Sequence, residues 1–235
     1  MAALDDLLDS IFGGTQPAFY PEFVEWVRES RRYRAFAADY RTKIRAKLKN
    51  AQGESGVKDL RAELETASLL LRESRFALEY EKYAALKQRG PDFTVTFKTH
   101  TPFNVEVRRI RSVELNAEDA EARANKLIAV LCDKAGQMPP NIVNLLWLVA
   151  DRAISEADVD HAAATLRQLA ESKTETFFTR RGFESAAGFL KQYRHLSGIV
   201  LRQPDATVFW PNPLARHKTP PEIVTAVQRL GTSPG

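Results

Sequence analysis

The sequence predicts a mixed α/β protein built around one central sheet. Two short runs, 93–97 and 103–108, alternate with a period of two residues and are rich in β-branched and aromatic side chains, which is typical of paired strands. The run 142–150 is almost entirely apolar, as expected of a strand that is buried on both faces. Segments with the apolar spacing of amphipathic helices lie between these runs, so we expect helices to flank the sheet.

The first fifty residues are expected to be helical. The apolar residues of 4–12 have the spacing of one helix face, and Gly13-Gly14 ends that pattern. Pro21 lies where the first turn of a helix tolerates proline, and a single basic helix is expected from there to about Asn50. The composition of Gln52–Gly56 indicates a linker. We therefore expect an N-terminal helical extension, residues 1–55, followed by an α/β domain, residues 56–235.

The predicted α/β domain begins with a helix over 57–88, which Gly90-Pro91 ends. The hairpin of 93–97 and 103–108 follows, and then a helix that runs to about Ala135. After the buried strand, Ser155 and Asp158 resemble a capping box at the start of a helix. The elements expected beyond that helix are a short helix over 182–194, strands over 198–201 and 207–210, and a last helix that starts near Thr219.

Positive charge is concentrated in one segment of the chain. The formal net charge is +4, yet residues 28–49 hold nine basic and two acidic residues, so the rest of the chain is slightly acidic. Such a segment points to phosphate, an anionic surface or an acidic partner. We expect Arg31, Arg32, Lys43 and Lys47 to bind nucleic acid, whereas a merely solvated helix face is the alternative.

Several classes of protein are excluded by the composition. The single cysteine, Cys132, cannot form an internal disulfide, and the four histidines are too scattered for a zinc site. The first residues are acidic where a signal peptide is basic, and no apolar run is long enough to cross a bilayer. We expect a soluble, cytoplasmic protein without a membrane partner, in which Cys132 and His195 pack in the structure rather than react.

Three polar side chains lie on the predicted hairpin. Asp92 precedes its first strand, and Glu106 and Arg108 project from one face of the second. A carboxylate beside a core is unfavourable unless it is paired or binds a metal. Two carboxylates, Asp92 and Glu106, suit Mg²⁺ or Mn²⁺. In the alternative interpretation, Asp92 caps the hairpin and Glu106 forms a buried ion pair with Arg108 or Arg109.

The segments Pro91-Asp92-Phe93 and Glu106-Val107-Arg108 resemble the core motif of the PD-(D/E)XK, or restriction-endonuclease-like, nuclease superfamily. The resemblance covers roughly 60–150 and includes the helix before the motif, the helix after it and the buried strand. It implies a restriction-endonuclease-like core, with a central mixed sheet flanked by helices, and metal-dependent hydrolysis of phosphodiester bonds in nucleic acid, DNA being the expected class. Asp92 and Glu106 would then hold Mg²⁺ (or Mn²⁺), and Arg108 would stabilise the negative charge that develops during catalysis.

The family often carries a further acidic residue on the helix before the motif. We expect Glu79 to be this residue and a further metal ligand, with Glu81 and Glu73 as alternatives.

The sequence departs from the family pattern in two places. Arg108 replaces the lysine that, by the resemblance, orients or activates the attacking water, and an arginine cannot act as a base. The predicted helix also runs directly to Gly90-Pro91, which leaves no room for the strand that many members place before the aspartate-bearing strand. The alternative function is therefore a catalytically inactive relative that binds nucleic acid or assembles with other proteins, and the N-terminal helices are a candidate interface for a homodimer.

Overall fold

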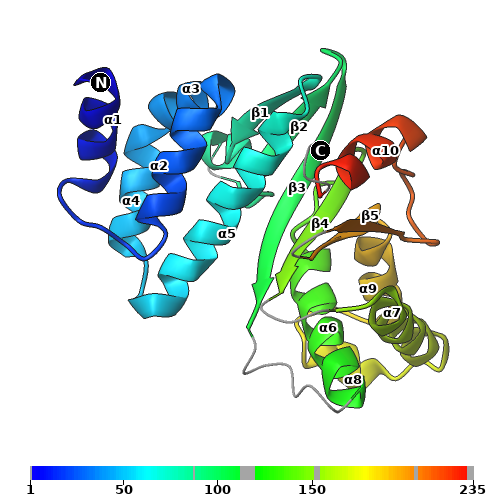
Figure 1. The fold of residues 1–235 in the computed structure, drawn as a ribbon. Coiled ribbons are helices and arrows are strands. Elements are labelled where there is room, and N and C mark those ends of the chain that lie inside the picture. Colours follow the sequence, from blue (N-terminus) through cyan, green and yellow to red (C-terminus); the bar gives the residue numbers. More distant parts are fainter. Residues whose placement is uncertain (1, 87, 112–119, 151–153, 204–205, 232–235) are drawn as a thin grey trace.

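The computed structural model describes residues 2–86, 88–111, 120–150, 154–203 and 206–231 (Figure 1). The described residues form a six-stranded sheet in the order β1-β2-β3-β4-β5-β6. The strands β1 to β3 form an antiparallel meander, β4 and β5 continue parallel to β3, and β6 is antiparallel to β5. The bounds of the strands are Phe76–Tyr80 (β1), Phe93–Phe97 (β2), Thr101–Ile110 (β3), Val143–Ala150 (β4), Gly198–Arg202 (β5) and Thr207–Pro211 (β6).

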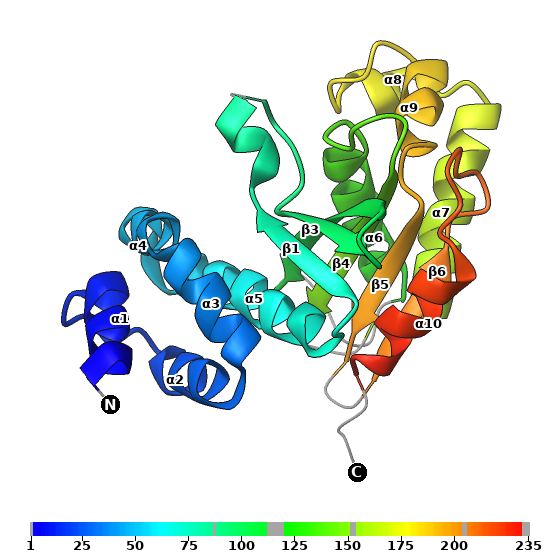
Figure 2. The same cartoon turned by 90° about the horizontal axis from the view of Figure 1, so that it is seen from above.

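Helices cover both faces of the sheet (Figure 2). On one face lie α1 (Ala2–Phe12), α2 (Tyr20–Glu29), α3 (Arg31–Asp39), α4 (Arg41–Asn50), α5 (Gly53–Arg72) and α10 (Pro221–Arg229). On the other face lie α6 (Ala120–Ala135), α7 (Glu156–Glu171), α8 (Glu175–Thr179) and α9 (Ala186–Tyr193). The strand period of two assigns alternate residues of β3 to the two faces: Phe103, Val105 and Val107 join the first hydrophobic cluster, so Asn104 and Glu106 face α6.

The expected mixed α/β fold class is confirmed, as are the hairpin β2–β3, the buried strand β4 and the pair β5–β6. The capping box of α7 is also present, because the Ser155 side chain accepts from the Asp158 backbone N–H and the Asp158 carboxylate accepts from Ser155. Cys132 and Trp147 are buried.

The expectation of one basic helix from Pro21 to Asn50 is wrong. Ser30 has an extended backbone (φ −115°, ψ 112°), and its hydroxyl accepts a hydrogen bond from the Tyr33 N–H. This is the N-cap arrangement that serine favours, so α3 starts as a new helix. A second break at Tyr40 separates α3 from α4.

The helix expected over 57–88 is also too long, because α5 ends at Arg72 and β1 follows it. Phe76 and Tyr80, the first and last residues of β1, lie on the same face and are buried. The Tyr80 ring stacks on Phe93 of β2 with the ring centroids 5.1 Å apart. A short 3-10 helix, η1 (Lys82–Leu86), then leads towards β2. The strand before Asp92, for which the predicted helix left no room, is therefore present.

Gly53–Gly56, expected in a linker, forms the first turn of α5. Buried side chains of α1 to α4 belong to the same hydrophobic cluster as those of β1 to β3, while the division at residue 55 stays a prediction. No helix within the described residues combines the length and the apolar character needed to span a bilayer.

Candidate active site

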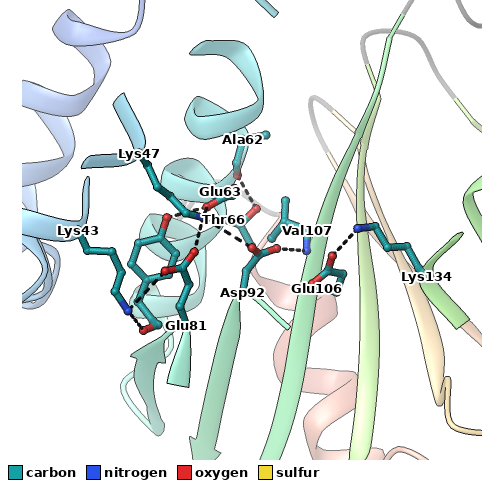
Figure 3. Close-up of polar contacts among 11 residues, drawn as sticks. Lys43, Lys47, Ala62, Glu63, Thr66, Glu81, Asp92, Glu106, Val107 and Lys134 are labelled. Carbon is teal, nitrogen blue, oxygen red and sulfur yellow. Dashed lines mark hydrogen bonds and ion pairs between the residues drawn. The ribbon is translucent and has the colours of Figure 1, made fainter. Parts of the chain in front are cut away.

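Asp92 lies where β2 begins and β3 runs on past it. Phe93 is opposite Val105 in the antiparallel register, which places Asp92 across from Glu106. Since β2 has not yet begun at this level, the Val107 N–H has no strand partner there, and Asp92 Oδ2 accepts its hydrogen bond at 2.8 Å. The backbone carbonyl of Asp92 also accepts from the Glu81 N–H at 2.6 Å. These two bonds fix the aspartate beside β3 (Figure 3).

Glu106 points from β3 towards α6, where its Oε1 lies 2.7 Å from the Lys134 Nζ. The two side chains are 8% and 14% exposed, so this is a buried ion pair. The alternative pairing of Glu106 with Arg108 or Arg109 is wrong. Arg109 points to the opposite face of the sheet and pairs with Asp59 of α5 at 2.8 Å.

Lys47 of α4 lies among three carboxylates. Its Nζ is 2.5 Å from Glu63 Oε2, 2.8 Å from Glu81 Oε1 and 3.9 Å from Asp92 Oδ1. The Tyr80 hydroxyl donates a further hydrogen bond to Glu63 at 2.6 Å, and the Lys47 Nζ lies 4.9 Å from the centre of the Tyr80 ring. Asp92 and Glu106 are therefore each approached by a lysine, Lys47 of α4 and Lys134 of α6 respectively, and these two helices lie on opposite faces of the sheet.

The electrostatics of the site favour protonated or cation-bound carboxylates. Burial, together with the charges of Glu63 and Glu106, raises the pKa of Asp92 well above its ordinary value, although Lys47 and the Val107 N–H oppose the shift. Burial also raises the pKa of Glu106, against the opposing effect of Lys134. Burial disfavours the ammonium form of Lys47, but the carboxylates of Glu63 and Asp92 outweigh this and raise its pKa. Burial is thus the main reason why the two carboxyls favour the protonated form.

Glu79 does not lie on a helix, so that expectation is wrong. It lies on β1, its side chain is 51% exposed, and it pairs with Lys82 at 2.9 Å. Of the alternatives, Glu81 is in the Lys47 cluster, whereas Glu73 bonds Arg75. The acidic residue of the preceding helix that reaches the site is Glu63 of α5.

Glu63 and Lys134 were not found from the sequence. A signal for Glu63 exists, because it lies three residues after Leu60 and four before Ala67, on the buried side of α5. A carboxylate at such a position is costly unless it has partners.

Arg108 lies one strand repeat beyond Glu106 on β3, which is about 7 Å along the strand. Its Nε is buried and has no hydrogen-bond partner among the described residues. Within the described residues, Arg108 forms no hydrogen bond or ion pair with Asp92 or Glu106. The structure therefore does not bring Arg108 to the carboxylate pair.

The basic residues expected to bind nucleic acid mostly face inward. Arg32 donates hydrogen bonds to the carbonyls of Leu71, Glu73 and Phe76, where α5 ends and β1 begins. Lys43 donates to the Tyr80 carbonyl at 2.8 Å and pairs with Glu81 at 3.5 Å, and Lys47 is in the carboxylate cluster. Of the four, only Arg31 is exposed. Arg32, Lys43 and Lys47 are therefore used inside the fold, whereas other basic residues of this segment are exposed.

Replacing Arg32 by alanine should lower the free energy of unfolding by about 2–3 kcal/mol, because three carbonyls lose a charged donor. The neighbouring change Arg31→Ala removes the same charge from an exposed side chain, and we expect it to stay within about 0.5 kcal/mol of the wild type. Urea unfolding followed by tryptophan fluorescence measures both. Equal effects of the two changes would contradict a structural role for Arg32.

The donor set fits a divalent cation only in part. Within the described residues, no three Asp, Glu, His or Cys side chains are grouped closely enough to hold a metal ion. Asp92 and Glu106 nevertheless form a carboxylate pair, and Mg²⁺ is commonly held by one or two carboxylates, with water and substrate phosphates completing its shell. Burial raises the pKa of both carboxyls, and a bound cation would stabilise their ionised form.

No protein-family model, no curated protein and no solved structure matches this chain.

Proposed function

We propose that this protein is a metal-dependent nuclease that hydrolyses phosphodiester bonds in nucleic acid, DNA being the expected substrate. The observation that carries the proposal is the carboxylate pair of the half-buried Asp92 and the buried Glu106, set opposite each other where β2 and β3 part. The element order α5-β1-β2-β3-α6-β4 supports it, because it supplies the helices, the extra strand and the buried strand of the PD-(D/E)XK core. We further propose that this chain has a restriction-endonuclease-like core.

The proposed chemistry divides among the residues of the site. Asp92 and Glu106 would hold the cation, which would polarise the phosphodiester and lower the pKa of the attacking water. Glu63 adds negative charge beside Asp92. Lys134 takes over the task that the resemblance assigns to the missing lysine, because its ammonium lies 2.7 Å from Glu106 and can offset charge in the transition state.

A cleavage assay tests this proposal. Linear and circular duplex DNA, single-stranded DNA and RNA are incubated with Mg²⁺, Mn²⁺ or EDTA. We expect cleavage of at least one substrate that requires the metal and falls to background in Glu106→Gln, which keeps the shape of the side chain but removes its charge. Glu79→Gln, a change at an exposed carboxylate of β1, serves as the matched control and should cleave like the wild type. Equal cleavage by wild type and Glu106→Gln would indicate a contaminant.

A catalytically inactive relative that binds nucleic acid is the second candidate. It is favoured by the ion pairs that already neutralise the carboxylates, Glu106 with Lys134 and Asp92 with Lys47, and by the lack of a metal-holding triad in the described residues. This candidate predicts salt-dependent binding of nucleic acid without turnover. Metal-independent binding with no cleavage of any substrate would support it.

A further inference from the structure

A cavity of about 600 Å³ lies beside the end of α9, and four of the residues that line it are basic or histidine. Lys191, Arg194, His195 and Arg216 line it, and no carboxylate belongs to its described lining. Lys191, Arg194 and Arg216 are exposed, and none of the three forms an ion pair with a described carboxylate. At the candidate active site, by contrast, Lys43, Lys47 and Lys134 are each paired with a carboxylate.

The cations converge because the backbone brings two segments together. The Arg216 N–H donates to the Arg194 carbonyl at 2.8 Å, which ties the segment after β6 to the end of α9. Burial lowers the pKa of His195, a backbone hydrogen bond at Met138 opposes this, and the charges of Arg216, His217 and Lys191 lower it further. The Nε2 of His217 is buried without a hydrogen-bond partner among the described residues.

The cavity lies on the same face of the sheet as Glu106, and a chain of hydrogen bonds connects its lining to β3. The His195 carbonyl accepts from Asn144 Nδ2 of β4 at 2.9 Å, and Asn144 Oδ1 accepts from Asn104 Nδ2 of β3 at 2.9 Å. Asn104 precedes Glu106 by two residues, about 7 Å along the strand. A second connection runs through α6, since a Cβ built at Gly136, two residues after Lys134, would lie 3.0 Å from the side-chain oxygen of Gln192.

We propose that this cavity, hereafter the α9 cavity, binds the phosphate backbone of the nucleic-acid strand that enters the candidate active site. Three unpaired cations provide contacts for successive phosphates. The remaining lining residues, Ala187, Leu190 and Leu214, are apolar and none is aromatic. They suit contact with sugars rather than base stacking, so binding should be independent of sequence. The identity of the polyanion rests on the proposed function, whereas the anion site itself does not.

A larger groove of about 940 Å³ is the main competitor. It is lined by Arg31, Arg32, Arg72 and Arg229, but Glu29 and Glu73 also line it. Arg32 is held by three backbone carbonyls. The α9 cavity therefore presents the stronger unneutralised charge.

Binding of fluorescein-labelled single-stranded and duplex DNA, measured by anisotropy in EDTA over a range of NaCl concentrations, tests the inference. The triple variant Lys191→Gln/Arg194→Gln/Arg216→Gln should bind about tenfold or more weakly, and the slope of log affinity against log salt should fall by about 2–3. The matched variant Arg28→Gln/Arg45→Gln/Lys49→Gln removes the same charge from exposed positions of the basic segment and should change the affinity little. Both triples should keep the circular dichroism spectrum of the wild type.

Several outcomes would overturn the inference: unchanged binding in the α9 triple, equal losses in both triples, or displacement of DNA by inorganic phosphate or polyglutamate at matched charge. The first would place binding elsewhere, the second would indicate only long-range attraction, and the third a free-anion or acidic-polypeptide site. EDTA prevents metal-dependent hydrolysis, so binding is measured separately from cleavage. If the wild type never cleaves but the α9 triple variant binds DNA more weakly, the result supports the α9 cavity and refutes the nuclease proposal. If the wild type cleaves but the α9 triple variant binds DNA as tightly as the wild type, the result supports the nuclease proposal and refutes the α9 cavity.

Discussion

Replacing Lys134 by methionine should lower the free energy of unfolding by about 3–5 kcal/mol, because the change leaves a buried charge without its partner. The Lys134 and Glu106 side chains are 14% and 8% exposed and lie 2.7 Å apart. Methionine keeps the length of the aliphatic stem, so the loss of packing is small. Chemical unfolding at neutral pH measures the effect. If the protein is a nuclease, the same variant should also lose metal-dependent cleavage.

Two controls separate the ion pair from a general effect of the substitution. Lys58→Met removes a lysine that is 50% exposed and paired with Glu54 one helical turn away, and it should change stability by less than about 0.5 kcal/mol. Adding Glu106→Gln to Lys134→Met should restore much of the lost stability, because the unpaired charge is then absent. If the double variant is as unstable as Lys134→Met, the loss comes from packing and the ion pair has no special role.

The sequence predicted the elements whose burial follows a simple period. The runs 93–97 and 103–108 alternate cleanly, and the apolar run 142–150 is a strand buried on both faces. The strand β1 escaped detection because Phe76, Leu78 and Tyr80 alternate over only five residues. They also continue the spacing of the preceding helix, and such short apolar runs are ambiguous between helix and strand.

Only part of the candidate site could be predicted from the sequence. Asp92 and Glu106 are recognisable because a hairpin register brings them together, and a register can be read from local pattern. Glu63 and Lys134 come from helices on opposite faces of the sheet, and only the packing of α5 and α6 determines their approach. Nothing in the local sequence separates Lys134 from a solvated lysine at a helix end.

The basic segment shows a related limit of reasoning from charge. Its composition indicated a phosphate-binding helix, but the breaks at Ser30 and Tyr40 turn α3 and α4 so that Arg32, Lys43 and Lys47 reach backbone carbonyls and carboxylates. A count of charges records how many cations are present, whereas their partners depend on tertiary structure.

Asp92→Asn should stabilise the metal-free protein at pH 7 by about 0.5–2 kcal/mol, the range of substitutions that relieve an unfavourable active-site arrangement. The amide oxygen can still accept the Val107 N–H, while the charge repulsion with Glu63 and Glu106 disappears. Thermal unfolding in EDTA measures the change. A loss of stability would show that Lys47 holds the carboxylate favourably and that the repulsion from Glu63 and Glu106 does not dominate.

The dependence of stability on pH follows from the same raised pKa of Asp92. The pKa of Asp92 is raised above its ordinary value of 3.8 by burial and by neighbouring carboxylates, so the folded state binds this proton more tightly than the unfolded state. The stability that this proton contributes is complete below that ordinary value and is lost as the pH rises through the raised pKa. In EDTA, the wild type should therefore lose stability across this interval relative to Asp92→Asn, and the difference should vanish in acid.

Divalent metal should reverse the ranking of the two proteins at pH 7. A cation that binds the folded wild type at a hundred times its Kd adds about 2.7 kcal/mol to the free energy of unfolding, whereas Asp92→Asn lacks one of the two carboxylates and should gain much less. Melting temperatures with and without Mg²⁺ or Mn²⁺ measure this without any substrate. If neither ion raises the melting temperature of the wild type, the result argues against a metal site at Asp92 and Glu106 and for the catalytically inactive relative. Lys47 and Lys134 would then supply the positive charge beside this pair of carboxylates.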